Sequence, residues 1–185
     1  MRKDFGAQTF LYPMPVLIIA TYGEDGTPNA MNAAWGGIAD TNKISICLSA
    51  EHKTVKNILA RKAFTVSMAT AAQVTAADYV GLVSGNNVPD KIARAGWHTV
   101  KSEHVDAPVI SELPMNLDCR LESYDEESGL LIGEIVNVSA DETVLSDGKI
   151  DPAKLCPITF DPVNNAYLQL GQKVGTAFHD GAQLK

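Results

Sequence analysis

The sequence predicts a mainly β fold with two or three helices, formed by a single domain that spans residues 1–185. Short apolar segments recur along the chain, and turn-forming clusters of glycine, proline, asparagine and aspartate separate them. Few segments have the i, i+3, i+4 spacing of apolar residues that is typical of a helix. A chain of 185 residues with 45% hydrophobic residues can bury one sizeable core.

The first predicted hairpin covers residues 16–37. Residues 16–22 form a β-branched apolar run, residues 23–28 contain the turn-forming Asp25-Gly26 pair, and residues 29–37 form the second strand. Pro13 and Pro15 forbid a helix ahead of this hairpin, so we expect an extended lead-in along a neighbouring segment.

The strand at residues 29–37 has one almost bare face. Alternation places on that face the residues Ala30, Asn32, Ala34 and Gly36, opposite Asn29, Met31, Ala33 and Trp35. A strand that gives up side-chain packing on one face indicates either a tightly packed neighbouring element or a flat ligand against its backbone. Residues 43–48 are expected to form the neighbouring strand.

An amphipathic helix should follow, because Val55, Ile58 and Leu59 have helical spacing. Its first turn would carry Lys53 and Thr54, and Thr54 is expected to cap free amides. A helix start with unpaired N–H groups, a hydroxyl and an ammonium favours a phosphate, although most helix starts are simply solvated. Together, the bare strand and this helix start suggest a planar ring tethered to a phosphate.

Further elements follow in order. Residues 64–68 alternate and predict a strand, and residues 73–83 predict a helix that stops at the turn formers 84–89. Taken alone, Asp90-Lys91 is as consistent with an ordinary salt-bridged helix start as with another role for the lysine, and these residues do not decide between the two.

The second half of the chain is predicted to be mostly extended. Residues 98–105 and 109–113 read as short strands, and residues 116–124 and 130–138 as a hairpin whose apolar residues alternate as in a barrel. Asp147-Gly148-Lys149 forms a further turn, and Pro152 and Pro157 predict an irregular segment.

Three motifs resemble the flavin reductase-like family, and its flavoredoxin branch in particular. They are Asn32-Ala33-Ala34-Trp35, His52-Lys53-Thr54-Val55-Lys56-Asn57-Ile58, and Ser84-Gly85 followed by Asp90-Lys91. Residues 12–16 and 170–178 extend the resemblance over nearly the whole chain. It implies an FMN-binding split β-barrel, Greek-key-like, that works as a homodimer.

The resemblance also implies which residues contact the cofactor. The expected cofactor-binding residues are Asn32, Ala33, Ala34, Trp35, Ser49, Ala50, His52, Lys53, Thr54, Ser84, Gly85 and Lys91. Phe178 in the tail is a further residue that could border the flavin. No catalytic side chain is expected, because the flavin itself supplies the hydride chemistry.

Composition excludes several classes of partner and site. A net charge of -7 and a pI near 5.0 argue against nucleic acid or an anionic membrane. No apolar run approaches the roughly 20 residues that span a bilayer, and no signal peptide is evident, so we expect a cytoplasmic protein. Cys47, Cys119 and Cys156 are expected to be free buried thiols, and His98 and His104 surface residues rather than metal ligands.

Three functions remain open from the sequence. The leading hypothesis is an oxidoreductase that holds FMN, takes hydride from NADH or NADPH and passes electrons to free flavin or another acceptor. The alternative is an FMN electron-transfer protein that a redox partner protein reduces. A binding module for flavin or haem is a third class, but His52 sits beside the expected phosphate site and is poorly placed as an axial haem ligand.

Overall fold

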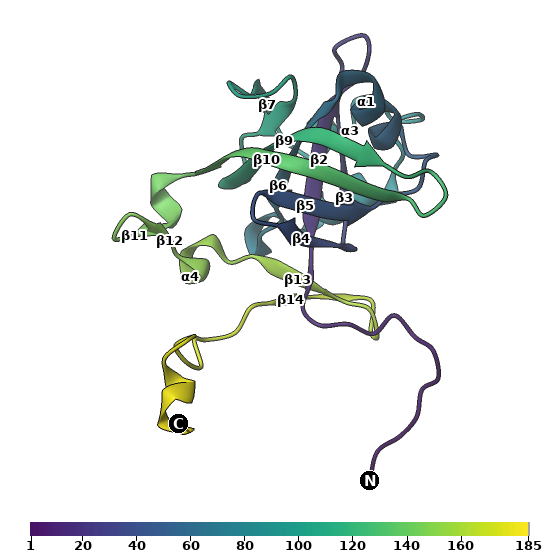
Figure 1. The fold of residues 1–185 in the computed structure, drawn as a ribbon. Helices are drawn as coiled ribbons and strands as arrows, with labels where there is room; N and C mark the ends of the chain where they lie inside the picture. Colours follow the sequence, from purple (N-terminus) through teal and green to yellow (C-terminus); the bar gives the residue numbers. More distant parts are fainter. Residues whose placement is uncertain (185) are drawn as a thin grey trace.

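A computed structural model describes residues 1–184. Seven antiparallel strands form one curled sheet in the order β3-β2-β6-β9-β10-β5-β4 (Figure 1). Their bounds are β2 (Leu17–Tyr22), β3 (Pro28–Ala33), β4 (Gly36–Asp40), β5 (Lys43–Cys47), β6 (Ala63–Met68), β9 (Met115–Tyr124) and β10 (Leu130–Ala140). The mainly β split-barrel prediction is confirmed.

The two edge strands of this sheet are consecutive in the chain. β3 pairs only with β2, and β4 pairs only with β5, yet Ala34 and Trp35 alone separate β3 from β4. The sheet must therefore curl until its two edges approach each other at this dipeptide. The prediction of one continuous strand over residues 29–37 is wrong, because the chain changes its pairing partner at Ala34-Trp35.

Three small sheets flank the curled one. They are β1 (Met14–Pro15) with β13 (Ile158–Asp161) and β14 (Ala166–Gln169), β7 (Thr99–Lys101) with β8 (Pro108–Ile110), and β11 (Leu145–Ser146) with β12 (Lys149–Ile150). The pairing of β1 with β13 confirms the extended lead-in at Pro13 and Pro15.

Four α-helices and three 3₁₀ turns complete the described chain. They are α1 (Lys53–Arg61), η1 (Ala71–Gln73), α2 (Val74–Leu82), α3 (Lys91–Arg94), η2 (Glu142–Val144), α4 (Pro152–Leu155) and η3 (Asp180–Leu184). The helices predicted near residues 53 and 73 are confirmed. The irregular segment predicted around Pro152 is in fact the short helix α4, because Asp151 caps it by accepting a hydrogen bond from the Ala153 N–H, and Pro152 occupies the first helical turn.

Strand β2 is buried on both faces and separates two cores. Ile18 packs with helix α2, whereas Ile19 packs with Phe64 and with α1 inside the curled sheet. Helix α1 buries Thr54, Val55, Asn57 and Ile58. Leu59, predicted to lie on this face, is 38% exposed because it falls beyond the buried stripe.

The bare face of β3 is covered by helix α2. Ala30 packs with Ala77 and Val80 of that helix, and the Asn32 Nδ2 donates to the Ala77 carbonyl oxygen at 2.9 Å. A Cβ at Gly81 would collide with the Asn32 side chain. Close packing against α2 therefore accounts for the bare face at Ala30, whereas Asn32 and Ala34 also line a cavity.

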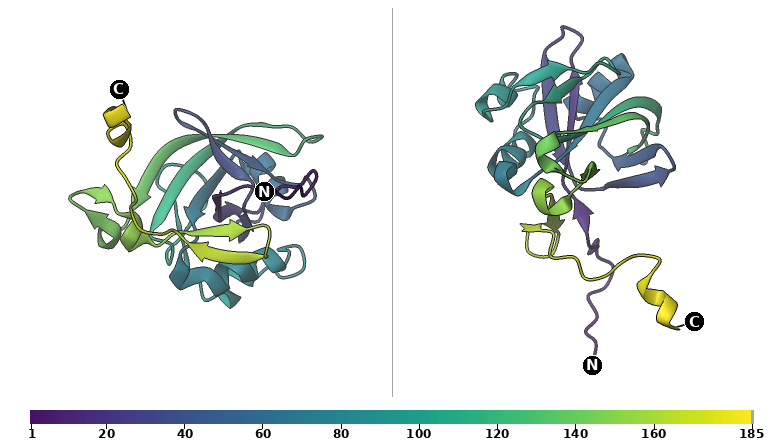
Figure 2. Two further views of the ribbon diagram at one scale, coloured as in Figure 1. Left: turned by 90° about the horizontal axis from the view of Figure 1, so that it is seen from below. Right: turned by 90° about the vertical axis from the view of Figure 1, so that its left-hand side faces the viewer.

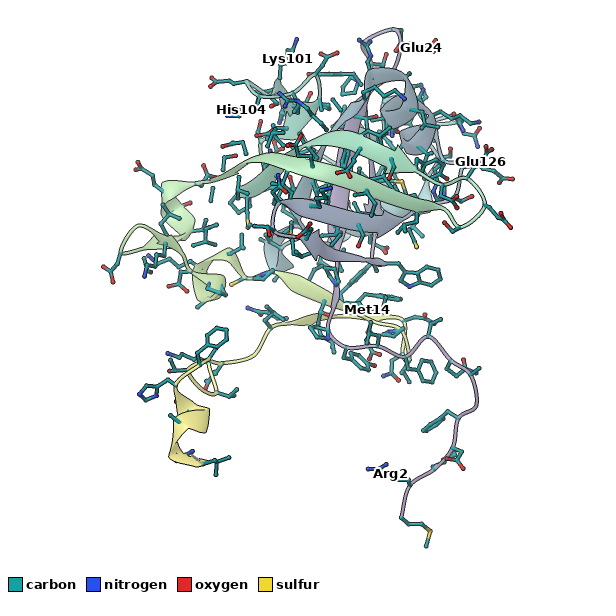
Figure 3. The ribbon with its side chains drawn as sticks, in the orientation of Figure 1. Arg2, Met14, Glu24, Lys101, His104 and Glu126 are labelled. Atoms are coloured by element: carbon teal, nitrogen blue, oxygen red, sulfur yellow. The ribbon has the colours of Figure 1, made fainter. Side chains whose placement is uncertain are left out.

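Both chain ends leave the body on the same side. The arm that precedes β1 and the tail that follows β14 extend away from the sheets, and Met14 lies at the base of the arm with Arg2 far along it (Figures 1, 2 and 3). Phe178 in the tail is fully exposed and lines none of the cavities described below. Within the same residues, the helices are all too short or too polar to cross a membrane.

Candidate functional site

A largely apolar cavity of about 330 Å³ opens where the two edges of the curled sheet approach. We call it the Trp35 cavity. It is lined by Val16, Met31, Asn32, Ala33, Ala34, Trp35, Cys47, Leu48, His52, Phe160 and Tyr167. The end of β3 and the Ala34-Trp35 link line it, and the small side chains of Ala33 and Ala34 let a ligand approach the backbone closely.

A second cavity of about 330 Å³, more polar than the first, lies between the start of α1 and the end of α2. We call it the Lys53 cavity. It is lined by Asn29, Met31, Glu51, His52, Lys53, Thr54, Val80, Gly81, Leu82, Val83, Ser84, Gly85 and Lys91. Because Met31 and His52 line both cavities, the two adjoin and can receive two ends of one ligand.

The start of helix α1 faces the Lys53 cavity with uncapped backbone amides. Its N-cap residue is His52, and no side chain caps the helix. The expectation that Thr54 caps these amides is wrong, because Thr54 lies within the first turn and its Oγ1 accepts a hydrogen bond from Asn29 Nδ2 at 2.8 Å. The free N–H groups therefore remain available to an anion.

Asn29 links the two walls of the Lys53 cavity. Besides holding Thr54, its buried Oδ1 has no hydrogen-bond partner within residues 1–184 and lies against Gly85. A Cβ at Gly85 would collide with that oxygen, so only glycine lets the loop after α2 approach so closely.

Lys91 carries an ammonium that is buried at the end of helix α2. Its Nζ donates to the Val80 and Val83 carbonyl oxygens, both at 2.9 Å, and its side chain is almost fully buried. Burial, together with the nearby charge of Lys53, lowers the pKa of Lys91 to about 8. The explanation of Asp90-Lys91 as a salt-bridged pair is wrong, because Asp90 pairs with Arg94 at 3.0 Å. Lys91 instead lines the Lys53 cavity.

Most of the residues expected at the cofactor site gather around these cavities. The Trp35 cavity receives Asn32, Ala33, Ala34 and Trp35, the Lys53 cavity receives Lys53, Thr54, Ser84, Gly85 and Lys91, and His52 borders both. Ser49 and Ala50 line neither cavity, because they form the turn ahead of α1.

Several lining residues escaped the sequence analysis. Phe160 and Tyr167 arrive from β13 and β14, more than a hundred residues after β3, and no local motif marks them. Asn29 and Met31 were not predicted as lining residues, although they lie on the predicted strand, on the face opposite the bare one.

The cysteines and histidines add no metal site within the described chain. Cys119 is buried, and burial raises the pKa of its thiol to about 12. Cys156 is half-buried, whereas Cys47, expected to be buried, is exposed because Ile44 and Ile46 take the core-facing positions of β5. Residues 1–184 contain no group of three His, Cys, Asp or Glu side chains that could hold a metal ion.

Comparison with known proteins places the chain among flavoproteins. Residues 9–159 match the family model of the flavin reductase-like domain. The structure of flavoredoxin from Desulfovibrio vulgaris (Miyazaki F) is 40% identical, with a TM-score of 0.94 over 98% of this chain and 100% of that one. Flavoredoxin from Methanosarcina acetivorans is 27% identical, with a TM-score of 0.90 over 100% of both chains. An FMN-binding domain of a flavin reductase-like enzyme from Shewanella baltica OS155, 22% identical, shares the fold with a TM-score of 0.79 over 88% of each chain.

Proposed function

Since this chain belongs to the flavin reductase-like family, in its flavoredoxin branch, we propose that it binds FMN and takes hydride from NADH or NADPH. Electrons then pass to free flavin or to another acceptor. The observation that carries the proposal is the pair of adjoining cavities, one largely apolar, the other more polar and lined by Lys53 and Lys91. This pairing matches a planar ring joined through a polar chain to a phosphate.

The Lys53 cavity fits a terminal phosphate. Lys53 and Lys91 supply positive charge, the first turn of α1 supplies uncapped amides, and Ser84 and Thr54 supply hydroxyls. Charge-assisted hydrogen bonds from ammonium groups to phosphate are stronger than neutral ones. Glu51 is the one carboxylate on this lining, and it is exposed to solvent.

The Trp35 cavity fits the ring. Val16, Met31 and Leu48 offer apolar contacts, and the backbone of residues 32–35 offers N–H groups to a heteroaromatic edge. Bound FMN would supply the hydride and electron transfer chemistry. The part of the protein is to bind and orient the ring and to tune it by hydrogen bonds, so no acid or base side chain is assigned.

An apolar groove beside the Trp35 cavity offers room for an electron donor. It measures about 710 Å³, lies between the N-terminal arm and strands β4 and β5, and shares Ala34, Trp35 and Cys47 with the Trp35 cavity. The groove shares no lining residue with the Lys53 cavity, so a donor in it would approach the ring without displacing the phosphate. This space is the reason why we place nicotinamide first among the donors.

Reduction by a nicotinamide tests the proposal. Mixing the FMN-loaded protein anaerobically with NADH or NADPH should bleach the flavin absorbance band, and added free flavin should sustain turnover. Dithionite serves as the control that the bound flavin is reducible. A protein that is colourless and does not quench the fluorescence of micromolar FMN on titration would refute the cofactor assignment itself.

An electron carrier is the second candidate function, and the 40% identity to a flavoredoxin favours it. A carrier would receive electrons from a redox protein instead of a nicotinamide. If neither nicotinamide reduces the flavin within minutes while dithionite does, this candidate replaces the first.

We also propose that the protein works as a homodimer. Apolar side chains are exposed on the arm, on edge strand β4 and on the tail, among them Phe5, Ile38, Val174 and Phe178, which lie outside the donor groove. A symmetric partner would cover such surface. Light scattering should give twice the chain mass of 19.8 kDa. A monomer at tens of micromolar that still binds FMN tightly would contradict this proposal.

The affinity for FMN should fall as the pH rises from 7 to 9. Lys91 loses its charge through this range because its pKa lies at about 8, and the phosphate favours the charged form. If only the charged form of Lys91 contributes to FMN binding, the affinity falls about tenfold between pH 7 and pH 9, because the protonated fraction of Lys91 falls by that factor. Fluorescence titrations at each pH measure it. Lys91→Met should bind FMN more weakly with a flat profile over this range, and an unchanged slope in this variant would assign the titration to another group.

A further inference from the structure

Three buried side-chain polar atoms lack a hydrogen-bond partner within residues 1–184, and all three belong to one cluster beside the Lys53 cavity. They are Thr21 Oγ1, Asn29 Oδ1 and Asn57 Nδ2. Thr21 and Asn29 face each other across β2 and β3, and helix α1, which carries Thr54 and Asn57, packs against both strands. An unpartnered buried polar atom costs free energy, so its presence at this place calls for a reason.

A hydrogen bond inside this cluster leaves one hydroxyl proton without an acceptor. Asn29 Nδ2 donates to Thr54 Oγ1 at 2.8 Å, and both side chains are buried and line the Lys53 cavity. An amide nitrogen only donates, so the Thr54 oxygen acts here as the acceptor and keeps its own proton for another partner. No acceptor for that proton is found among residues 1–184. The Thr54 hydroxyl is therefore left as a donor at the wall of the cavity.

The orientation of the Asn29 amide decides whether this donor exists. Turned over, the amide would present its oxygen to the hydroxyl and take up the proton itself. In the structure the oxygen instead lies against Gly85, so closely that an added Cβ would be 2.1 Å from it. Gly85 lines the same cavity as Lys53 and Lys91, whose positive charge favours the oxygen end of the amide dipole on that side. The cationic lining thus keeps Nδ2 directed at Thr54.

We propose that Asn29 is a positioning residue, which directs the proton of the Thr54 hydroxyl to a phosphate oxygen of the bound ligand. This inference rests on the proposed function, because FMN supplies that phosphate. A phosphate dianion only accepts hydrogen bonds, so a hydroxyl whose acceptor side is already occupied matches it. The unpartnered Asn29 oxygen is the consequence of holding the amide in this orientation.

A double-mutant cycle tests the coupling between the two residues. Thr54→Val is introduced into wild type, Asn29→Leu and Asn29→Asp, and each protein is titrated by flavin fluorescence with FMN and with riboflavin. In wild type the substitution should weaken FMN about tenfold and leave riboflavin unchanged, as expected for a hydrogen bond to a charged acceptor. After Asn29→Leu, which leaves the hydroxyl undirected, the loss should be about threefold. After Asn29→Asp, whose carboxylate takes up the hydroxyl proton, it should stay within about twofold.

Asn57→Leu is the matched control, because Asn57 lies in the same cluster and on the same helix as Thr54 but lines neither the Trp35 cavity nor the Lys53 cavity. In that background Thr54→Val should weaken FMN by the full wild-type factor. Riboflavin binding shows that each variant is folded, and Asn29→Asp keeps the shape of the side chain should Asn29→Leu not fold.

Equal losses of FMN in every background would show that Asn29 and Thr54 act independently, and they would overturn the inference while leaving the proposed function intact. A merely structural role of Asn29 gives this same result, because it weakens FMN and riboflavin alike without changing the effect of Thr54→Val. A wild type that binds FMN no more tightly than riboflavin would overturn the phosphate assignment and the inference together.

Discussion

Replacing Lys53 with alanine should weaken FMN binding between roughly tenfold and a hundredfold, while riboflavin binding changes by less than about threefold. Lys53 stands at the first position of α1, where its ammonium and the free backbone amides face the same cavity. Riboflavin has no phosphate, so a loss confined to FMN reports the phosphate contact alone. Fluorescence quenching titrations with both ligands provide the comparison.

Lys56→Ala is the matched control for this substitution. Lys56 belongs to the same helix but is exposed and lines neither the Trp35 cavity nor the Lys53 cavity. It should leave both affinities within a factor of about two, because an isolated surface charge at this distance is screened by salt. Equal losses of FMN and riboflavin in Lys53→Ala would mean that the phosphate lies elsewhere.

The phosphate side of the site was predictable because its chemistry is local in sequence. A helix start, a lysine and a hydroxyl follow one another at residues 52–54, and the periodicity of Val55 and Ile58 fixes the helix on which they stand. Lys91 required the family resemblance, because nothing in its local sequence separates a buried ammonium from a salt-bridged one.

The ring side was predictable only in part, since it depends on how the sheet closes. The alternation of residues 29–37 could not reveal the change of partner at Ala34-Trp35, which both lines the Trp35 cavity and brings the sheet edges together. Ile44 and Ile46 take the core-facing positions of β5, and the apolar character of the whole run concealed that Cys47 faces outward. Tyr167 reaches the cavity through tertiary pairing that no short motif encodes.

The closure of the sheet itself should depend on Gly133. This glycine is buried on β10, and a Cβ there would collide with the ring of Phe64, which is fully buried and has no space to move. Gly133→Val should therefore cost about 3 kcal/mol of unfolding free energy, as overpacking does, and lower Tm by roughly 6 to 12 °C. Thermal unfolding followed by circular dichroism measures the shift.

Gly37→Val is the control that separates the collision with Phe64 from the effect of valine on strand propensity. Gly37 also lies in the curled sheet, on β4, but a Cβ there would meet nothing within 4 Å. The same substitution should therefore leave Tm unchanged or raise it slightly, because valine favours extended backbone more than glycine does. Adding Phe64→Leu to Gly133→Val should recover part of the lost stability, because the smaller side chain makes room for the new methyl groups. The stability effects of substitutions at residues in contact are not additive. If the double variant loses the full sum of the two single costs, the Phe64 ring is not what opposes a side chain at Gly133.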